Sequence, residues 1–385
     1  MRILIAPDKF KGSLSAREVA KHIATGIRRV LPQAQLSEVP MADGGEGTVQ
    51  SLVDATDGEK VAVTVTGPLG KPVEAFFGIL GDRRTAVIEM ASASGLVLVP
   101  PEKRDPRVTT TRGTGELLLA AAARGCSKAI VGIGGSATND GGAGMAQAVG
   151  IQLLDAAGAE LPPGGAALAR LHTIDASRLD PTVASMEIVV ASDVTNPLCG
   201  PSGASAVYGP QKGATPQMVA ELDAALAHYA DVILAQLGKA VGELHGAGAA
   251  GGLGAGLLAF LPARMKRGVD IVVDVVGLEA LVSAADLVIT GEGGIDSQTA
   301  FGKAPAGVAE VAVRYGKPVI ALAGSVADDA RQLHAHGFDA VFSLVRRPMT
   351  LAEAIEGSPT FLEDAAEQIM RLLLVGATFC QRQLS

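Results

Sequence analysis

The sequence lacks the features that several classes of function require. Tryptophan is absent and aromatic residues make up 3% of the 385 residues, so a base-stacking surface for single-stranded nucleic acid is not expected. The net charge of −8 also disfavours nucleic acid and an anionic membrane surface as partners. The three cysteines, at positions 126, 199 and 380, are too few and too scattered for a disulfide framework or a metal cluster.

Signals for secretion or membrane insertion are also missing. The chain opens on a strand-like run followed by the acidic Asp8, which does not read as a signal peptide. The uncharged stretch 246–263 contains six glycines and Pro262, which favour a glycine loop before a buried helix over a membrane span. Together with the cysteine usage, these features predict a cytoplasmic protein.

The signatures of several large enzyme families are absent as well. The sequence has no Walker A motif, no protein-kinase D-F-G or H-R-D motif and no G-x-S-x-G nucleophile elbow. Any phosphoryl transfer must therefore use a different phosphate-binding loop.

What the sequence does contain is a repeated pairing of an apolar run with a polar, glycine-rich loop. The runs span 2–6, 129–133, 187–191, 286–290 and 319–323, and the loops that follow them span 7–13, 134–142, 192–196, 291–296 and 324–325. Short apolar runs bounded by turn residues predict buried strands. In parallel sheets the loops after the strands build the ligand site, and these loops carry amides, lysines and carboxylates suited to phosphate. We therefore expect an enzyme that acts on a phosphorylated ligand.

The order of these elements predicts an α/β protein with two domains. Residues 1–60 and 284–385 alternate strands with helices, which predicts a parallel sheet. The two chain ends are therefore expected to form one discontinuous Rossmann/flavodoxin-like domain, with helices near 15–30, 304–315, 327–336 and from about 360. Residues 61–283 begin with two alternating apolar runs around a turn, which predicts an antiparallel hairpin in an inserted mixed α/β domain. The active cleft is expected between the two domains.

The first candidate site follows strand 2–6. Lys9 and Lys11 flank an apolar residue there, with Asp8 and Ser13 beside them, so this loop is expected to bind an anion unless it is merely a solvated turn. The stretch 42–47 adds two carboxylates, Asp43 and Glu46, which suit Mg²⁺ or the orientation of a substrate-binding lysine, with ordinary helix capping as the alternative.

The glycine-rich stretch 132–142 allows two interpretations. Its beginning fits the dinucleotide pattern G-x-G-x-x-A, with Asp155 about 20 residues further on, as in NAD-binding proteins. The loop continues to Gly142, however, where the helix of a dinucleotide site would already be running. Hydroxyls, an amide and a carboxylate between glycine pairs suit a polyphosphate with a metal better. The predicted nucleotide contacts are Gly134, Gly135, Ser136, Thr138, Asn139 and Asp140.

The remaining candidates lie in loops that follow strands or open helices. Arginine offers a planar fork for phosphate or carboxylate, and carboxylates at strand ends are held rigidly enough for catalysis or metal binding. A capped or salt-bridged turn is the alternative for each loop. These candidates are Arg112, Asp193, Asn196, Lys212, Glu292 and Asp296.

Taken together, six of these stretches resemble the bacterial glycerate kinase family (type 1). They read DKFKGSL at 8–14, ADGGEG at 42–47, GGSATNDGG at 134–142, SDVTNPLCG at 192–200, YGPQKG at 208–213 and TGEGG at 290–294. The resemblance runs in order from Arg2 to about Ser325. It implies two α/β domains and an ATP- and Mg²⁺-dependent phosphorylation of D-glycerate, usually at the 2-hydroxyl to give 2-phosphoglycerate. The chain departs from the family's pattern at Gly294, where a basic residue is typical.

The chemistry of the loops suggests a role for each candidate. Asp193 is expected to accept the hydroxyl proton, with Asp296 as the second choice. Lys9, Lys11 and Arg112 are expected to bind the glycerate carboxylate or the transferring phosphoryl group. Further substrate contacts are Asp8, Ser13, Asn196 and Lys212, and the metal candidates are Glu292, Asp43 and Glu46.

Three other functions stay open at this point. The phosphoryl group could go to the 3-hydroxyl, the enzyme could be an NAD-dependent hydroxy-acid oxidoreductase, or the protein could be a sensor that binds these ligands without turnover. The expected partners are D-glycerate and ATP, and a homodimer is possible.

Overall fold

The computed structural model describes residues 1–45, 47–300 and 302–384, with side chains described up to residue 379 in the last helix. The chain forms two compact units, each of the α/β class, which confirms the predicted fold class. Unit 1 comprises Met1–Asp43 and Val269–Ser385, and unit 2 comprises Gly44–Gly268. Both chain ends thus belong to unit 1.

The two boundaries lie at other positions than the predicted 60/61 and 283/284. Helix α2 (Thr48–Ala55) belongs to unit 2, because it packs on strands β3 to β5 of that unit. Gly78 permits this packing, since a Cβ there would lie 2.6 Å from a methyl group of Val53 in α2. Helix α11 (Leu278–Ala284) contacts β1 and α12 and belongs to unit 1. Sequence pattern shows where a helix lies but not which of two sheets it covers.

Unit 1 is built on a fully parallel five-stranded sheet in the order β13-β12-β11-β1-β2. Its strands are β1 (Arg2–Ile5), β2 (Gln35–Glu38), β11 (Leu287–Ile295), β12 (Val319–Val326) and β13 (Ala340–Ser343). β2 lies on one side of β1, and β11 to β13 lie on the other. The chain therefore changes direction across the sheet between β1 and β11, and ligands of open α/β sheets bind at the carboxyl ends of the strands at such a switch point.

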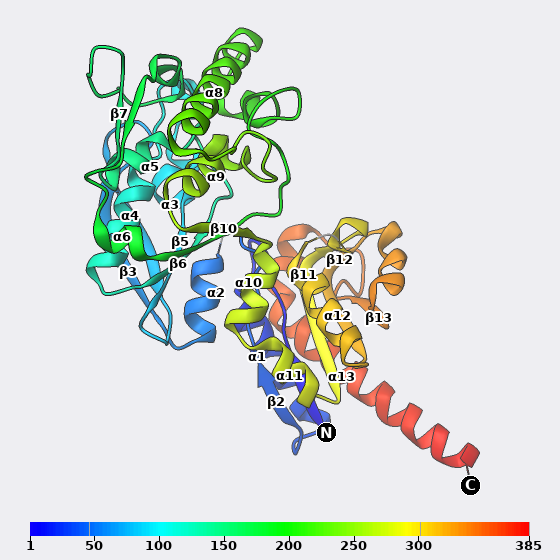
Figure 1. The fold of residues 1–385 in the computed structure, drawn as a ribbon. Helices are drawn as coiled ribbons and strands as arrows, with labels where there is room; N and C mark the ends of the chain where they lie inside the picture. Colours follow the sequence, from blue (N-terminus) through cyan, green and yellow to red (C-terminus); the bar gives the residue numbers. More distant parts are fainter. Residues whose placement is uncertain (46, 301, 385) are drawn as a thin grey trace. The chain divides into compact units, whose positions relative to one another are not determined.

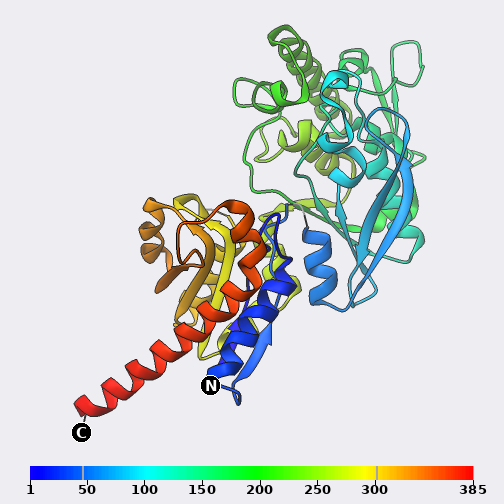
Figure 2. The same ribbon diagram turned by 180° about the vertical axis from the view of Figure 1, so that it is seen from behind.

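Helices cover both faces of this sheet. Helices α1 (Ala16–Val30) and α13 (Leu351–Leu384) lie side by side on one face, as Figure 2 shows. Helices α10 (Gly268–Val275), α11 and α12 (Ala304–Arg314) lie on the opposite face (Figure 1). Helix α1 begins as predicted, with a capping box between Ser15 and Glu18, and buries Val19, Ile23 and Ile27. Residues 328–336 form a 3₁₀ helix, η6 (Asp328–His336), rather than the α-helix expected there.

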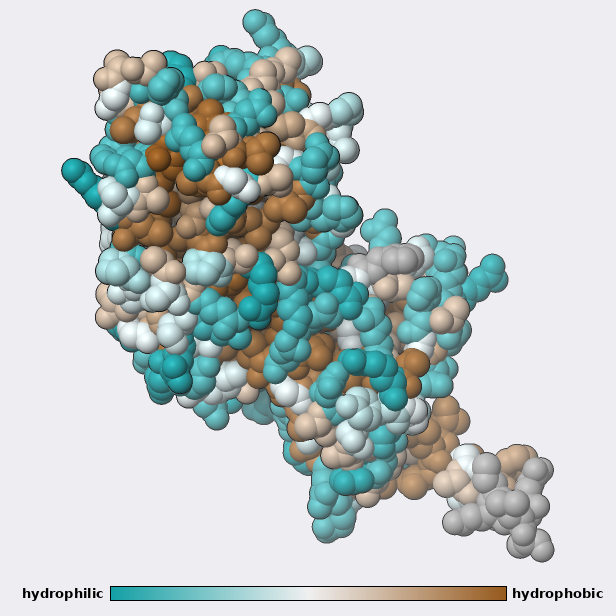
Figure 3. All heavy atoms as spheres, viewed as in Figure 1, coloured by the Kyte–Doolittle hydropathy of each residue, from teal (hydrophilic) through white to brown (hydrophobic). Residues whose placement is uncertain are grey.

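The end of α13 differs from the rest of unit 1. The helix runs beyond the sheet (Figure 2), and its last described turns expose Leu372, Val375 and Phe379, each by more than half. Hydrophobic spheres gather there in Figure 3, next to the residues drawn in grey. Among the described residues of unit 1, this segment has the largest number of exposed apolar side chains close together in the sequence.

Unit 2 is built on a mixed six-stranded sheet in the order β10-β9-β6-β5-β4-β3. The strands are β3 (Glu59–Thr66), β4 (Pro72–Ile79), β5 (Thr85–Glu89), β6 (Lys128–Gly132), β9 (Glu187–Ala191) and β10 (Ala263–Lys266). β5, β6, β9 and β10 are parallel, whereas β3 and β4 form the predicted antiparallel hairpin, with Val61 opposite Phe77 and Val65 opposite Val73. A short pair, β7 (Gln152–Leu154) and β8 (Thr173–Asp175), lies outside this sheet.

The helices of unit 2 surround a large apolar core that includes Phe77, Leu117 and Tyr229. They are α3 (Ala91–Ser94), α4 (Arg112–Ala123), α5 (Ala143–Ala148), α6 (Pro181–Ser185), α7 (Ala204–Tyr208), α8 (Pro216–Leu237) and α9 (Ala249–Phe260), with 3₁₀ turns η1 (Leu96–Leu98), η2 (Pro101–Lys103), η3 (Gly165–Arg170) and η4 (Pro210–Lys212). Helix α9 is interrupted by left-handed backbone at Ala250, Gly251 and Gly252 and is almost entirely buried. Among the described residues, no helix is both long and apolar enough to span a membrane.

Candidate active site

In unit 1, three carboxylates gather at the carboxyl ends of neighbouring strands. Asp8 follows β1, Asp43 follows β2 and Glu292 lies in β11, and the Asp8 amide donates to the carbonyl of Gly291 at 2.8 Å. Burial, then the negative charge of Asp43 and, more weakly, that of Glu292 raise the pKa of Asp8 to about 7. Like charges held together in a buried place repel, and either a proton or a bound cation relieves the repulsion. The cluster sits at the switch point between β1 and β11, where the fold predicts a ligand.

Glu292 is held by hydrogen bonds within the same cluster. Burial raises its pKa, whereas a hydrogen bond from the Thr299 hydroxyl at 2.7 Å and the nearby Lys303 act in the opposite direction. Lys303 Nζ lies 3.4 Å from Glu292 and 3.8 Å from Asp296. Asp296 also accepts hydrogen bonds from the backbone of Gln298 and Thr299, so part of its carboxylate caps the turn η5 (Ser297–Ala300). Glu46, the third predicted metal ligand, lies outside the described residues.

The donor set fits a divalent cation of the magnesium type. No group of three or more His, Cys, Asp or Glu residues is arranged to hold a metal within the described part of the chain. Mg²⁺ does not need such a group, because it usually takes one or two carboxylates together with phosphate oxygens and water. Asp8, which was predicted from the sequence to contact substrate, is here a metal candidate instead, because with Asp43 or Glu292 it provides that number of carboxylates, and a bound cation relieves their mutual repulsion.

Some polar groups of the loop after β1 bond to this carboxylate cluster, and others line a separate cavity. The Lys9 amide donates to Asp8 Oδ1 at 2.6 Å. Lys11 is exposed and lines an apolar cavity of about 260 Å³ together with Phe10, Gly293 and the beginning of α13. The Ser13 hydroxyl bonds to that of Ser358 in α13 at 2.6 Å. The hydroxyl thus links the loop to α13, and because Ser13 also lines this cavity, its contact with substrate stays a prediction.

In unit 2, the glycine-rich loop after β6 has an exposed beginning and a buried end. Gly134 and Gly135 are exposed, whereas Thr138, Asn139 and Asp140 are fully buried. Asp140 accepts hydrogen bonds from the amide and hydroxyl of Thr111 at 2.8 and 2.9 Å and from the amides of Gly142 and Gly144. Burial raises the pKa of this carboxyl, and these hydrogen bonds oppose the effect.

The burial of three residues therefore corrects the prediction of six nucleotide contacts. Thr138, Asn139 and Asp140 support the loop from behind, and Ser136 is only 7% exposed, so Gly134 and Gly135 are the two of the six that lie open to a ligand. The dinucleotide interpretation also loses its support, because the helix that follows, α5, begins only at Ala143.

Lys212 belongs to the same buried support. It is 1% exposed, and its ammonium donates to the carbonyl of Thr138 at 2.6 Å. Burial lowers the pKa of Lys212 to about 7, although nearby Asp140 opposes the shift. The predicted role as a substrate contact is thus replaced by that of an anchor for the loop, because a side chain buried this deeply is out of reach of a ligand.

This buried lysine makes the stability of the fold depend on pH. Between pH 7 and its ordinary value of 10.5, Lys212 keeps its proton in the unfolded chain and releases it in the folded protein, so stability rises with pH, by at most about 1.4 kcal/mol per unit. We expect wild type to gain free energy of unfolding from pH 7 to pH 9.5 relative to Lys212→Met, in urea titrations followed by circular dichroism. Lys239→Met is the matched control, since the exposed Lys239 also donates to backbone carbonyls. Parallel pH dependences of wild type and Lys212→Met contradict this expectation.

The loop after β9 presents one exposed carboxylate. Asp193 is exposed, and its Oδ1 accepts a hydrogen bond from the amide of Gly268 at 3.1 Å. Asn196 uses its amide within the loop, donating to Ser202 at 2.7 Å and accepting from the Tyr208 hydroxyl at 2.6 Å. These two bonds fix the side chain within the loop and leave one N–H and one lone pair, so the contact of Asn196 with substrate stays a prediction.

Arg112 stands at the first turn of α4. Its side chain is about half exposed and lies 3.2 Å from Glu116, which in turn accepts hydrogen bonds from the amide and hydroxyl of Thr66. The guanidinium is thereby oriented but still reachable from solvent, as a ligand-binding arginine must be.

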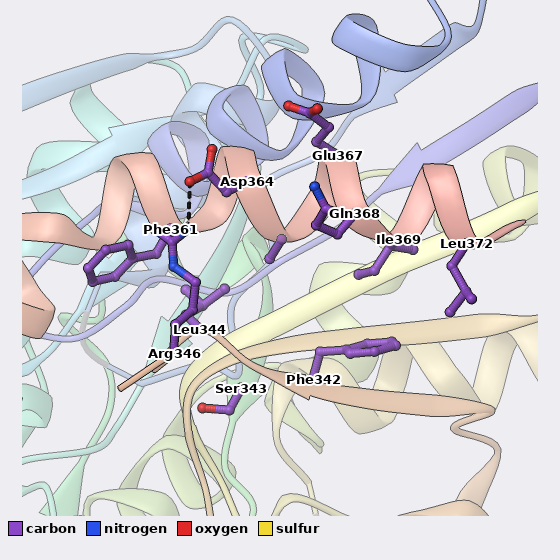
Figure 4. A pocket seen from close by; sticks show the side chains of 11 residues that line it. Phe342, Ser343, Leu344, Arg346, Phe361, Asp364, Glu367, Gln368, Ile369 and Leu372 are labelled. Carbon is purple, nitrogen blue, oxygen red and sulfur yellow. Dashed lines mark hydrogen bonds and ion pairs between the residues drawn. The ribbon is translucent and has the colours of Figure 1, made fainter. Parts of the chain in front are cut away.

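The sequence-based prediction missed one strand end. Glu89 closes β5 and lines a cavity of about 380 Å³ with Phe76, Val97, Gly134 and Gly135. The signal was present, because Thr85–Glu89 is a sixth apolar run that ends in a carboxylate. Another cavity, of about 620 Å³, lies between β13 and α13 in unit 1 (Figure 4). It contains the ion pair of Arg346 and Asp364, and no predicted site residue lines it.

The fold and these strand-end clusters define the class of α/β enzymes whose ligand sites lie at the carboxyl ends of parallel strands. The family model for the glycerate kinase family matches residues 3–374. The glycerate kinase of Bacillus subtilis (strain 168) is 55% identical over 378 residues, which cover 98% of this chain and 99% of the relative. The glycerate 2-kinase of Escherichia coli (strain K12) is 54% identical over 376 residues, with 98% and 99% covered.

The solved structures agree with the sequence relatives. A crystal structure described as glycerate kinase 2 from Salmonella typhimurium LT2 superposes with a TM-score of 0.91 at 53% identity and covers 98% of this chain and 99% of its own. This chain belongs to the glycerate kinase family, and it is an enzyme of that type.

Proposed function

We propose that this enzyme transfers the terminal phosphoryl group of ATP to the 2-hydroxyl of D-glycerate and so produces 2-phosphoglycerate. Membership of a kinase family implies ATP as the phosphate donor. The 2-position is supported by the name of the Escherichia coli relative, glycerate 2-kinase. Transfer to the 3-hydroxyl is the alternative. The oxidoreductase alternative is set aside, because the chain belongs to a kinase family.

The observation that carries the proposal is the carboxylate cluster of unit 1. Asp8, Asp43 and Glu292 would hold Mg²⁺, which when bound would neutralise the charge of the nucleotide phosphates. Phosphoryl transfer needs positioning and charge neutralisation more than covalent help, and this cluster with its neighbouring lysines supplies both requirements. Lys9 and Lys11 would bind the phosphoryl group or the glycerate carboxylate from the same loop.

The remaining roles fall to exposed groups of unit 2. Gly134 and Gly135 would present backbone amides to the phosphates, since a glycine loop leaves them uncovered. Arg112 would bind an anionic group of either substrate. Asp193 is the proposed base for the hydroxyl proton because it is an accessible carboxylate at a strand end, and Asp296 is the second choice because hydrogen bonds to η5 engage it.

The position of phosphorylation is tested by the product itself. We expect ADP release that depends on both D-glycerate and Mg²⁺, and a product whose proton-coupled ³¹P signal is a doublet. A phosphate on the secondary 2-hydroxyl couples to one proton, whereas a phosphate on the primary 3-hydroxyl couples to two and gives a triplet. A triplet overturns the proposed position, and no ADP release with D-glycerate overturns the proposed substrate.

A further inference from the structure

The cavity at the carboxyl ends of β5 and β6 in unit 2 has no assigned ligand. Its volume is about 380 Å³, within the range of small-molecule sites, and among the described residues its lining combines bare glycine backbone with apolar side chains and one carboxylate. We propose that this cavity binds the nucleoside part of ATP, with the phosphates at the exposed glycines on its rim. This inference rests on the proposed function, since it locates the base and ribose of the same nucleotide.

The charge of the cavity decides which part of the nucleotide enters it. Glu89 lines the cavity, and its Oε1 accepts a hydrogen bond from the amide of Val49 at 2.9 Å, in the first turn of α2. A carboxylate disfavours phosphate nearby, but it accepts hydrogen bonds from amino and hydroxyl groups. Adenine offers its 6-amino group and ribose offers its hydroxyls as donors to this carboxylate. Glu89 therefore favours the nucleoside part of ATP, rather than its phosphates, inside the cavity.

Two apolar side chains provide the walls that a planar base requires. Phe76 in β4 lines the cavity, and the ammonium of Lys60 lies 3.6 Å from the centre of its ring. Such a cation–π contact holds the ring in place. Val97 in η1 is 90% exposed, although it belongs to a well-fastened segment. An apolar side chain that packs so little on its own protein and lines a cavity is suited to contact a ligand.

Hydrogen bonds fix Val97 relative to the glycine loop. The amide of Leu96 donates to the carbonyl of Gly135 at 2.8 Å, and the amide of Ala137 donates to the carbonyl of Ser94 at 2.9 Å. The segment that carries Val97 and the loop that carries Gly134 are thus one rigid piece. A base against Val97 would leave the phosphates beside the exposed amides of Gly134 and Gly135.

The space beside Gly134, at the rim of the cavity, is open to a ligand and is not filled by another part of the protein. A Cβ on Gly134 would meet no atom within 4 Å, and the backbone there is not left-handed. Packing does not require glycine at this position, in contrast to Gly132, whose added Cβ would lie 2.9 Å from the carbonyl of Gly44. Accessible space beside a bare amide is what an approaching phosphate needs.

Steady-state kinetics of two variants test the proposal. Val97→Asp places a charge on the wall, and Gly134→Val fills the rim, and neither is expected to disturb the fold because both sites are open. We expect each to raise KM for ATP about 10-fold or more, with KM for D-glycerate within about two-fold of wild type. Gly376→Ala is the control, since that exposed glycine in α13 also has no atom within 4 Å of an added Cβ.

Nucleotide binding without turnover separates this inference from the proposed function. A fluorescent ADP analogue carrying the methylanthraniloyl group on its ribose is displaced by ADP, and we expect Val97→Asp to weaken the affinity for ADP by a similar factor. If wild type binds ADP and Val97→Asp weakens that binding, but wild type shows no activity with D-glycerate, the proposed substrate fails and the cavity assignment stands. If Val97→Asp and Gly134→Val bind ADP as wild type does, or raise only KM for D-glycerate, the cavity assignment is overturned.

Discussion

Asp193→Asn lowers kcat for ADP release about 10²–10⁴-fold, which is the range for removal of a positioned general base. The side chain is exposed at the end of β9, so the substitution costs the core nothing. Asparagine has the same shape, and its oxygen can still accept the hydrogen bond from the Gly268 amide that aligns the carboxylate. The substitution removes the negative charge and the capacity to take a proton, so we expect the effect in the chemical step, with KM for ATP nearly unchanged.

A matched control for this variant is available in the same unit. Asp175 ends β8, and its Oδ1 accepts a hydrogen bond from the amide of Ser177 at 2.8 Å. Asp175→Asn makes the same chemical change at another strand end and is expected to keep wild-type turnover. Near-wild-type kcat for Asp193→Asn in a correctly folded protein removes Asp193 from the role of base, and Asp296→Asn becomes the next variant to measure.

Asp8→Asn is expected to lower Mg²⁺-dependent turnover by about 10²-fold or more. At the same time it is expected to raise the free energy of unfolding of the metal-free protein by about 1–3 kcal/mol at pH 8. The loss of turnover follows from removing one oxygen ligand and one charge at the strand-end cluster. The gain in stability follows because Asp8 is mostly buried near Asp43 and Glu292, and a neutral amide removes this repulsion. The measurements are the coupled ADP-release assay and urea unfolding in the presence of a chelator.

The opposite signs of the two effects make this prediction specific. A residue with a purely structural role would lose activity and stability together. Asp286→Asn is the control, because Asp286 precedes the other end of β11 and pairs with Arg2 at the surface. Loss of stability in Asp8→Asn, or full activity with Mg²⁺, contradicts the assignment of Asp8 to a metal-phosphate site.

The sequence was sufficient to predict where polar groups gather. Period-two alternation predicted the hairpin of β3 and β4, and the observed pairing of Val61 with Phe77 confirms it. Asp8, Asp43 and Glu292 are far apart in the chain, but the rule that parallel strands end at one edge of the sheet was enough to predict that such residues meet. Short segments carry the patterns that predict each strand and the polar residues after it. The rule for parallel sheets then places those strand ends at one edge.

Sequence reasoning failed where distant packing decides which way a side chain faces. Asn139 and Asp140 have the composition of a ligand-binding loop, but they are covered because Gly251 lets the kinked start of α9 approach them. A Cβ on Gly251 would lie 1.9 Å from the carbonyl of Thr138. Lys212 reaches the same loop from about 70 residues further on and donates a hydrogen bond to a carbonyl rather than to a ligand. Contacts of this kind depend on the assembled core and leave no local pattern.

Binding of Mn²⁺ in place of Mg²⁺ tests the central claim most directly, because the electron paramagnetic resonance signal of free Mn²⁺ disappears when the ion is bound. Titration of wild type in the presence of ADP is predicted to show one bound Mn²⁺ per protein. The affinity of the protein with ADP for this Mn²⁺ is predicted to exceed that of ADP without protein. Asp8→Asn is predicted to lose this additional affinity, whereas Asp286→Asn keeps it. Equal Mn²⁺ binding by wild type and Asp8→Asn would contradict the account that the strand-end carboxylates of unit 1 hold the metal of a phosphoryl-transfer site.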